Sequence, residues 1–132
     1  MHARTDVNTP FHIDLDWWRE RGRNFDRFLS EILDGEELED LSEDPIDYID
    51  TQNGEVFQLA PLWAQVLTSR AHRPGYITSA TPLTNAILRA LIENRNQPMS
   101  ALELQRRISR STPEALLRLM RTARQQYGIV PS

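Results

Sequence analysis

The sequence contains no cysteine and no lysine, and it has no long apolar run. The absence of cysteine excludes disulfides, thiolate zinc sites and cysteine nucleophiles together. No segment approaches the roughly 20 apolar residues that a membrane-spanning helix needs. No apolar stretch follows the first residues, as it would in a secretory signal. We therefore predict a cytoplasmic protein without a membrane partner.

All 15 basic residues are arginine. Because lysine is missing from the whole chain, including its acidic part, codon bias in a GC-rich genome is the simplest explanation. The alternative is functional, since the planar guanidinium pairs well with phosphates, carboxylates and guanine edges. An arginine that faces outward is therefore not, by itself, evidence for nucleic-acid binding.

Charge is sorted along the chain. Residues 1–58 carry 16 acidic residues and 5 arginines, a net charge of −11, whereas residues 59–132 carry 10 arginines and 3 glutamates, a net charge of +7. This asymmetry indicates that the basic part faces a polyanion or a protein partner. Because the whole chain has a net charge of −4, attraction to nucleic acid must come from a local patch.

The N-terminal part is predicted to hold a short extended segment followed by one helix. Residues 1–10 are polar and predicted to be flexible, and residues 11–15 alternate between apolar and polar as in a strand. Asp16 is a candidate N-cap for a helix that begins at Trp17 and ends at Asp34-Gly35. The apolar face of this helix is expected to include Trp18, Gly22, Phe25, Leu29 and Ile32, with Gly22 permitting close approach of another backbone.

An acidic segment, residues 36–44, leads into the clearest hairpin signal of the chain. Residues 46–50 and 55–59 have strand-like patterns and flank a turn, residues 51–54, that ends in Asn-Gly, a pair that readily supplies positive φ angles. We expect a two-stranded ribbon, joined by the segment 11–15. Pro61 suits the first turn of a helix that runs to about Ser69, and residues 71–80 are predicted to be a loop and a boundary.

From Thr81 onward, the sequence predicts three helices and a final strand. Thr81-Pro82 and Thr112-Pro113 are each a cap followed by proline, and Ser100 forms a capping box with Glu103. The predicted helices run over about residues 82–94, 101–109 and 113–126. Residues 95–98 break the first of these helices, residues 109–111 form a tight turn, and residues 129–131 are predicted to be a very short strand.

This order of elements over residues 81–130 resembles the winged helix-turn-helix superfamily. The resemblance is carried by Pro98-Met99-Ser100-Ala101-Leu102-Glu103-Leu104 at the second helix and by Tyr127-Gly128-Ile129 at the step into the wing. The sequence departs from the family pattern because it stops at Ser132, before a second wing strand. The wing is therefore expected to be truncated, or to be completed by the N-terminal half or by a partner.

The expected fold class is mainly α with a small β element (α+β). It combines a C-terminal winged helix-turn-helix-like three-helix unit with an N-terminal helix and a β-hairpin. The predicted regions are a flexible segment 1–10, an acidic region 11–75 and a helix-turn-helix-like region 76–132. The last two regions are either separate or share one core.

The resemblance implies that the third helix is a recognition helix. Glu114, Arg118, Arg121 and Gln125 recur at helical spacing and are expected to form one exposed stripe. Arginine and glutamine can pair bidentately with guanine and adenine, whereas Glu114 argues mildly against binding because it repels phosphates. The inward face is expected to consist of Leu116, Leu119, Met120, Ala123 and Tyr127. The candidate nucleic-acid-binding residues are Arg106, Arg107, Arg110, Ser111, Arg118, Arg121, Thr122 and Gln125.

No pattern predicts a catalytic residue, a cofactor, a metal site or a small-molecule substrate. His12, Asp14 and Asp16 alternate on one side of an extended segment, but polar positions on a half-exposed strand explain them more simply than a metal site does. The acidic segment lacks the Asp-x-Asp-x-Asp-Gly loop of calcium sites. The three tryptophans, Trp17, Trp18 and Trp63, are predicted to be core residues rather than base-stacking ones.

We predict a small non-enzymatic DNA-binding protein, or a transcription- or DNA-associated accessory factor. It would bind double-stranded DNA through the basic C-terminal helix-turn-helix. The alternative is a protein-interaction or assembly subunit, in which the winged-helix-like unit is a docking or homodimerisation module. In that case, the acidic and basic halves would pair within one chain or head to tail between chains.

Overall fold

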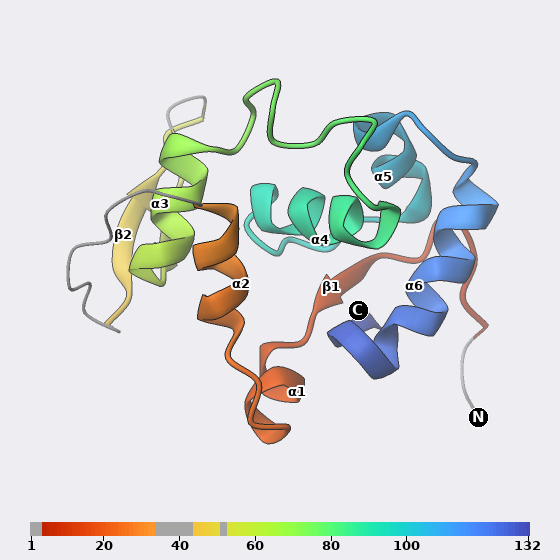
Figure 1. Ribbon diagram of the computed structural model, residues 1–132, viewed down its shortest axis with the longest axis horizontal. Helices are drawn as coiled ribbons and strands as arrows, with labels where there is room; N and C mark the ends of the chain where they lie inside the picture. The colour runs from red at the N-terminus through yellow and green to blue at the C-terminus, as the bar shows by residue number, and fades with distance from the viewer. Residues whose placement is uncertain (1–3, 34–43, 51–52) are drawn as a thin grey trace. The chain divides into compact units, whose positions relative to one another are not determined.

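The computed structural model describes residues 4–33, 44–50 and 53–132, and these form a mixed α and β fold (Figure 1). The described residues contain six helices and two small antiparallel sheets of two strands each. The elements, in order, are β1 (Phe11–Ile13), α1 (Leu15–Glu20), α2 (Phe25–Ile32), β2 (Ile46–Ile49), β3 (Val56–Leu59), α3 (Pro61–Ser69), α4 (Leu83–Glu93), α5 (Ala101–Ile108), α6 (Pro113–Tyr127) and β4 (Ile129–Pro131).

The chain divides into two compact units. Unit 1 joins the N-terminal part, up to Arg23, to Pro74–Ser132, and unit 2 is Asn24–Arg73. The predicted loop 71–80 does contain a boundary, but the ends of the chain belong together, so the units differ from the predicted regions 11–75 and 76–132. The predicted helix end at residues 34–35, the acidic residues 36–43 and turn residues 51–52 lie outside the described residues.

Helix α4 forms the centre of the unit 1 core. Ile87, Leu88, Leu91 and Ile92 have no exposed surface, because α4 is covered on several sides at once. Ala90 is buried with them, whereas Leu83, at the start of the helix, is only half-buried. Leu104 of α5 and Leu116 and Met120 of α6 complete the same core.

The local signals at the ends of α5 and α6 are confirmed. The Ser100 hydroxyl accepts a hydrogen bond from the Glu103 amide at 3.2 Å, and the Glu103 carboxylate accepts one from the Ser100 amide at 3.1 Å. Thr112 caps α6 by accepting from the Ala115 amide at 3.1 Å. The turn between the two helices contains Ser109 in the left-handed region, at φ 56°.

The predicted cap of α4 is wrong. The helix starts at Leu83 with Pro82 in the N-cap position and has no side-chain cap. The Thr81 hydroxyl instead accepts a hydrogen bond from the Thr78 amide at 3.0 Å. The preceding loop therefore uses the side chain that the sequence pattern assigned to the helix.

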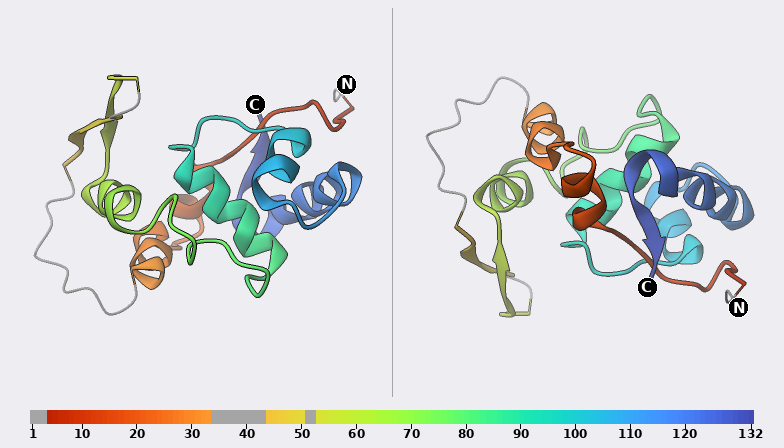
Figure 2. Two further views of the ribbon diagram at one scale, coloured as in Figure 1. Left: turned by 90° about the horizontal axis from the view of Figure 1, so that it is seen from above. Right: turned by 90° about the horizontal axis from the view of Figure 1, so that it is seen from below.

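Strand β1 lies between β4 and the segment that precedes α5, within unit 1 (Figure 2). Ile13 pairs with Ile129 on one edge, and Phe11 exchanges two backbone hydrogen bonds of 2.9 Å with Met99 on the other. The Asn96 side chain extends this second edge, because its amide accepts from Ile13 N at 2.8 Å and donates to Ile13 O at 2.9 Å. Both backbone edges of β1 are thus occupied.

The expectation that segment 11–15 joins the hairpin ribbon is therefore wrong. Its apolar side chains, Phe11 and Ile13, are buried in unit 1, and the hairpin belongs to unit 2. The predicted final strand is confirmed as β4, and its partner is this N-terminal segment. The antiparallel hairpin itself is confirmed, with Tyr48 opposite Phe57 and Ile49 opposite Val56.

The single N-terminal helix is also wrong, because the structure has two helices there. Asp14, rather than Asp16, caps α1, and Asn24 caps α2. The chain turns between the two helices at Gly22, which has φ +64° and no atom within 4 Å of an ideal Cβ. Gly22 is thus used for its backbone conformation and not for close approach of another backbone.

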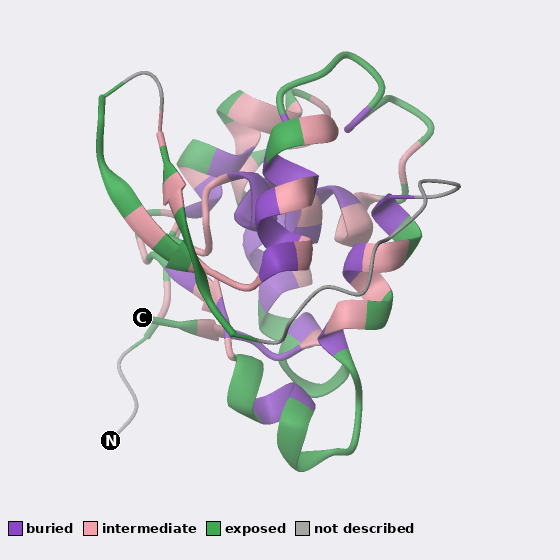
Figure 3. Ribbon diagram, turned by 90° about the vertical axis from the view of Figure 1, so that its left-hand side faces the viewer, coloured by how far each residue is buried: buried purple, intermediate pink, exposed green. Residues whose placement is uncertain are grey.

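Unit 2 is built from α2, α3 and the hairpin. The ring centroids of Phe25 and Trp63 lie 5.6 Å apart, and Leu29 and Val66 are fully buried, as expected for two packed apolar faces. Helix α3 has the predicted bounds. The hairpin strands are exposed or half-buried along their length, as Figure 3 shows in green and pink.

Helix α1 is fixed to the C-terminal end of α6. The Trp18 indole donates to Tyr127 O at 2.9 Å, and Asp14 N donates to Gly128 O at 2.8 Å. Gly128 ends α6 at φ +63°, and an ideal Cβ there would lie 3.0 Å from Trp17 Cε3. Both the backbone angle and the packing therefore favour glycine at this position.

We predict that Gly128→Ala destabilises the protein more than Gly22→Ala. Each change costs about 1–2 kcal/mol because alanine disfavours a left-handed backbone angle. Only Gly128→Ala also forces a methyl group against Trp17, which adds about 1 kcal/mol or more. Urea denaturation followed by circular dichroism measures both free energies of unfolding. Equal losses in the two variants would contradict this packing of α1 on α6.

Candidate nucleic-acid interface

Helix α6 sorts its side chains as the sequence predicts. Glu114, Arg118, Arg121 and Gln125 are all exposed, with Thr122 beside them. Leu116, Met120 and Ala123 are buried, and Leu119 and Tyr127 are half-buried. Leu117, which the sequence analysis did not include in the inward face, is also buried. The exposed stripe, Glu114, Arg118, Arg121, Thr122 and Gln125, is called the α6 stripe below.

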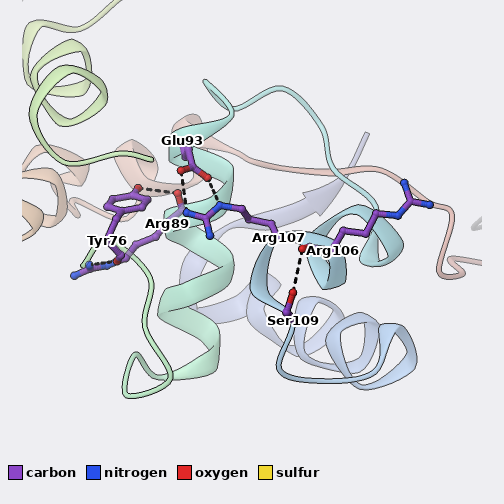
Figure 4. A network of polar contacts seen from close by, with 6 residues as sticks. All are labelled: Tyr76, Arg89, Glu93, Arg106, Arg107 and Ser109. Atoms are coloured by element: carbon purple, nitrogen blue, oxygen red, sulfur yellow. Dashed lines mark hydrogen bonds and ion pairs between the residues drawn. The ribbon is translucent and has the colours of Figure 1, made fainter. Parts of the chain in front are cut away.

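Two of the candidate arginines are available for an external partner. The Arg118 and Arg106 guanidiniums make no hydrogen bond or ion pair within the described part of the chain, and both residues are exposed. Figure 4 shows Arg106 extending away from the neighbouring polar network. Each therefore presents a full set of donors to an external partner.

Arg121 already has an internal partner in the N-terminal segment. Its Nε donates to Thr5 Oγ1 at 2.7 Å, and a second guanidinium nitrogen donates to Thr5 O. The segment is further held by a hydrogen bond from Leu102 N to Val7 O and by one from Ser132 N to Pro10 O. Residues 4–10, predicted to be flexible, thus lie against the helices of unit 1, and Arg121 must leave Thr5 before it can contact a base.

Arg110 is occupied by the loop that precedes α4. Its guanidinium donates to three backbone oxygens, those of Thr78 at 3.0 Å, Ser79 at 2.7 Å and Thr81 at 2.5 Å. This fixes the loop to the turn between α5 and α6. Ser111, in that turn, is half-buried.

Arg107 forms an ion pair with a buried carboxylate (Figure 4). Its Nε donates to Glu93 Oε2 at 2.6 Å, and its second donor reaches Oε1 at 3.0 Å. The Glu93 side chain is 7% exposed. The hydrogen bond to Glu93 raises the pKa of Arg107 above its usual value. This bidentate pair ties α5 to α4, so Arg107 has an internal structural partner.

Tyr76 and Arg89 lie beside this ion pair. The Tyr76 hydroxyl donates to Arg89 O at 2.7 Å, and the Arg89 guanidinium donates back to Tyr76 O at 2.6 Å. Burial, with the negative charge of Glu93 as a second cause, raises the pKa of the Tyr76 hydroxyl well above its usual value. These hydrogen bonds hold the loop around Tyr76, near the beginning of Pro74–Ser132, against α4.

The two units have opposite charge. Unit 1 contains 12 arginines and 7 acidic residues, a net charge of +5, and unit 2 contains 3 arginines and 12 acidic residues, a net charge of −9. The four arginines of residues 1–23 join the basic unit together with four acidic residues, so the segment that leaves the acidic part of the chain has no net charge. The α6 stripe thus lies on the unit with excess positive charge.

The sequence analysis did not predict that Arg21 and Arg23, at the end of α1, lie near the C-terminal end of α6. The Arg21 guanidinium lies 4.4 Å from the Trp17 ring centroid, and Arg23 lies 4.9 Å from that of Trp18. Arg23 also donates to Gln126 O at 2.6 Å, at the end of α6. The only sequence signal was the pairing of two tryptophans with nearby arginines, which a long amphipathic helix explained equally well.

The residues considered for a metal site have other roles here. Asp14 caps α1, and His12 Nδ1 lies 2.6 Å from the Ser132 hydroxyl oxygen. Within residues 4–33, 44–50 and 53–132, no group of three or more metal-ligating side chains is placed to hold an ion. In the same ranges, every helix is too short or too polar to span a bilayer. The three tryptophans are buried, as predicted.

Comparisons with protein-family models, with curated proteins and with solved structures find no match for this chain.

We predict that Arg107→Met lowers the free energy of unfolding by about 3 kcal/mol, because it leaves the Glu93 carboxylate buried without this partner. The value is at the low end for a buried pair because the Arg107 side chain is 33% exposed. The adjacent Arg106→Met is the matched control and should change stability by less than about 0.5 kcal/mol. Urea denaturation tests both, and equal effects would show that the pair does not stabilise unit 1.

Proposed function

We propose that this protein is a small non-enzymatic DNA-binding or DNA-associated accessory protein that presents α6 to the major groove. The observation that carries the proposal is the α6 stripe, with Arg118 unengaged among the described residues, on a unit of net charge +5. Arginine and glutamine on one exposed helix face are the side chains that pair bidentately with guanine and adenine edges.

The arrangement of α5 and α6 supports this proposal. Two helices joined by a tight turn, the second of them exposed along one side, is the organisation of helix-turn-helix proteins. With 15 residues, α6 is about 22 Å long, enough to lie along a major groove. We further propose a winged-helix relationship, in which β1 pairs with β4 where a second wing strand would follow in the family.

The candidate residues divide into two groups under this proposal. Arg118, Thr122 and Gln125 would contact base edges, and Arg106 would contact a phosphate. Arg107 and Arg110 would support the fold, since Glu93 and the loop carbonyls occupy them. Arg121 would join the first group only after exchanging Thr5 for a base or phosphate.

We predict that the full chain binds duplex DNA in fluorescence anisotropy, with an affinity that falls steeply as salt rises, because neutralised phosphates release counterions. Arg118→Ala should weaken specific binding by about 1–3 kcal/mol if it reads a base. Arg27→Ala is the matched control, because Arg27 is an exposed helical arginine of unit 2 and its removal changes the net charge equally.

Two results would contradict the proposal. The first is no binding to any duplex at low salt. The second is binding that Arg118→Ala and Arg27→Ala weaken equally, because that would reflect net charge alone rather than contacts made by α6.

The alternative function, a protein-interaction or assembly subunit, is favoured by the hairpin of unit 2. Ile49 and Val56 lie directly opposite one another in the ribbon, and each is 59% exposed. An exposed apolar pair on a unit of net charge −9 fits a basic protein surface, such as unit 1 of a second copy. Salt-dependent self-association in sedimentation velocity, lost in Ile49→Thr and Val56→Thr and accompanied by no duplex binding, would support this alternative.

A further inference from the structure

We propose that α1 extends the DNA-binding surface, and that Arg21 and Arg124 hold a backbone phosphate in the groove between α1 and the C-terminal end of α6. This inference rests on the proposed function and names a second contact for it. The groove has a volume of about 760 Å³ and is lined by Trp17, Glu20, Arg21, Arg124 and Gln125. All of these residues belong to unit 1.

The position of α1 beside α6 is firmly set. Trp18 donates to Tyr127 O, Arg23 donates to Gln126 O, and Trp17 packs on Gly128. Arg23 thus satisfies a backbone oxygen of the last turn of α6, where a cation is also favoured by the helix dipole. It is therefore a positioning residue, and it is not counted among the phosphate ligands.

The two arginines that line the groove, Arg21 and Arg124, are exposed. Neither the Arg21 nor the Arg124 guanidinium makes a hydrogen bond or ion pair with any residue that the structure describes. Arg21 stacks on the Trp17 ring at 4.4 Å, which restrains the guanidinium while leaving its donors at the edge. Two guanidiniums that line one groove, one from the end of α1 and one from α6, fit an oxyanion.

The other residues that line the groove narrow the chemistry of the ligand. Trp17 is 8% exposed, and Arg21 covers its ring. The ring therefore has no free face on which a nucleobase could stack. Glu20 contributes one negative charge, which leaves the groove with a net charge of +1 from its ionised lining residues. A single backbone phosphate, which carries one negative charge, matches this net charge of +1 better than a small multiply charged anion does.

The groove is continuous with the α6 stripe. Gln125 belongs to both, because it is the last residue of the stripe and also lines the groove. A duplex that contacts Arg118 and Gln125 with its base edges would carry its backbone toward the end of α6. The phosphate contact there would add affinity without adding sequence preference.

The test uses Arg21→Gln and Arg124→Gln in the full chain, because glutamine keeps much of the side-chain stem over Trp17. The matched control is Arg19→Gln in α1. The Arg19 side chain is 80% exposed, and it pairs with Asp16 at 3.2 Å. All three variants lose one positive charge. Urea denaturation first establishes that each variant folds with the stability of the parent chain.

We expect each groove variant to weaken binding about three- to tenfold on every duplex sequence, and to reduce the slope of log affinity against log salt by about 1. Arg19→Gln should change affinity less than twofold. A duplex with one neutral methylphosphonate linkage, moved stepwise along the backbone, should show one position at which the parent chain loses affinity and the Arg21→Gln variant does not.

Several outcomes would overturn the inference. If Arg118→Ala weakens binding but the groove variants match Arg19→Gln, the proposed function stands and the phosphate contact does not. If the groove variants abolish salt-dependent self-association and leave duplex binding unchanged, the groove binds an acidic protein surface. If the parent chain binds no duplex at low salt, the proposed function and the inference fail together.

Discussion

The structure depends on the hydrogen bonding of β1 along both of its edges. Phe11 pairs with Met99, Ile13 pairs with Ile129 and is also bound by the Asn96 side chain, so the N-terminal segment becomes an internal part of the C-terminal unit. Buried backbone groups need such partners, which makes this arrangement costly to open. It also brings α1 to the end of α6. Without this pairing, α1 would not be held beside α6, and the groove between the two helices would not form.

The arginines of this chain perform different physical tasks, although the sequence presents them as one type. Some complete the fold by donating to buried or backbone oxygens, as Arg107 does to Glu93 and Arg110 does to the loop before α4. Others leave their donors exposed, as Arg118 does on the α6 stripe. The proposed function relies on the second group, because a guanidinium with satisfied donors must break those bonds before it can bind a phosphate or a base. Its support is therefore in the pattern of unengaged side chains and not in the number of arginines.

The sequence predicted several elements whose signals are local, although the local cap assignments at Asp16 and Thr81 were wrong. The capping box at Ser100, the cap at Thr112 and the hairpin all rest on residues within a few positions of one another, and the structure contains each of them. The sequence left the partner of the final strand open, with the N-terminal half as one alternative, and it assigned residues 11–15 to the hairpin instead, because the pairing of β1 with β4 joins the two ends of the chain. The break at Gly22 was hidden because Trp18 and Phe25 are seven residues apart, so the apolar period continues across the turn. For the candidate site, helical spacing was enough to identify the exposed face of α6, whereas the internal partners of its arginines come from distant segments.

The most direct test of this account is native-state hydrogen exchange on the full chain. The backbone amides of Phe11, Ile13 and Asp14 donate to Met99 O, to the Asn96 side chain and to Gly128 O. If β1 is integral to unit 1, these three amides exchange only when the unit unfolds, with the same opening free energy as the amides of the α4 core. Exchange of the three amides by a local opening several kcal/mol below that of α4 would contradict the account, because β1 would then be a terminal segment that detaches while the helices stay folded.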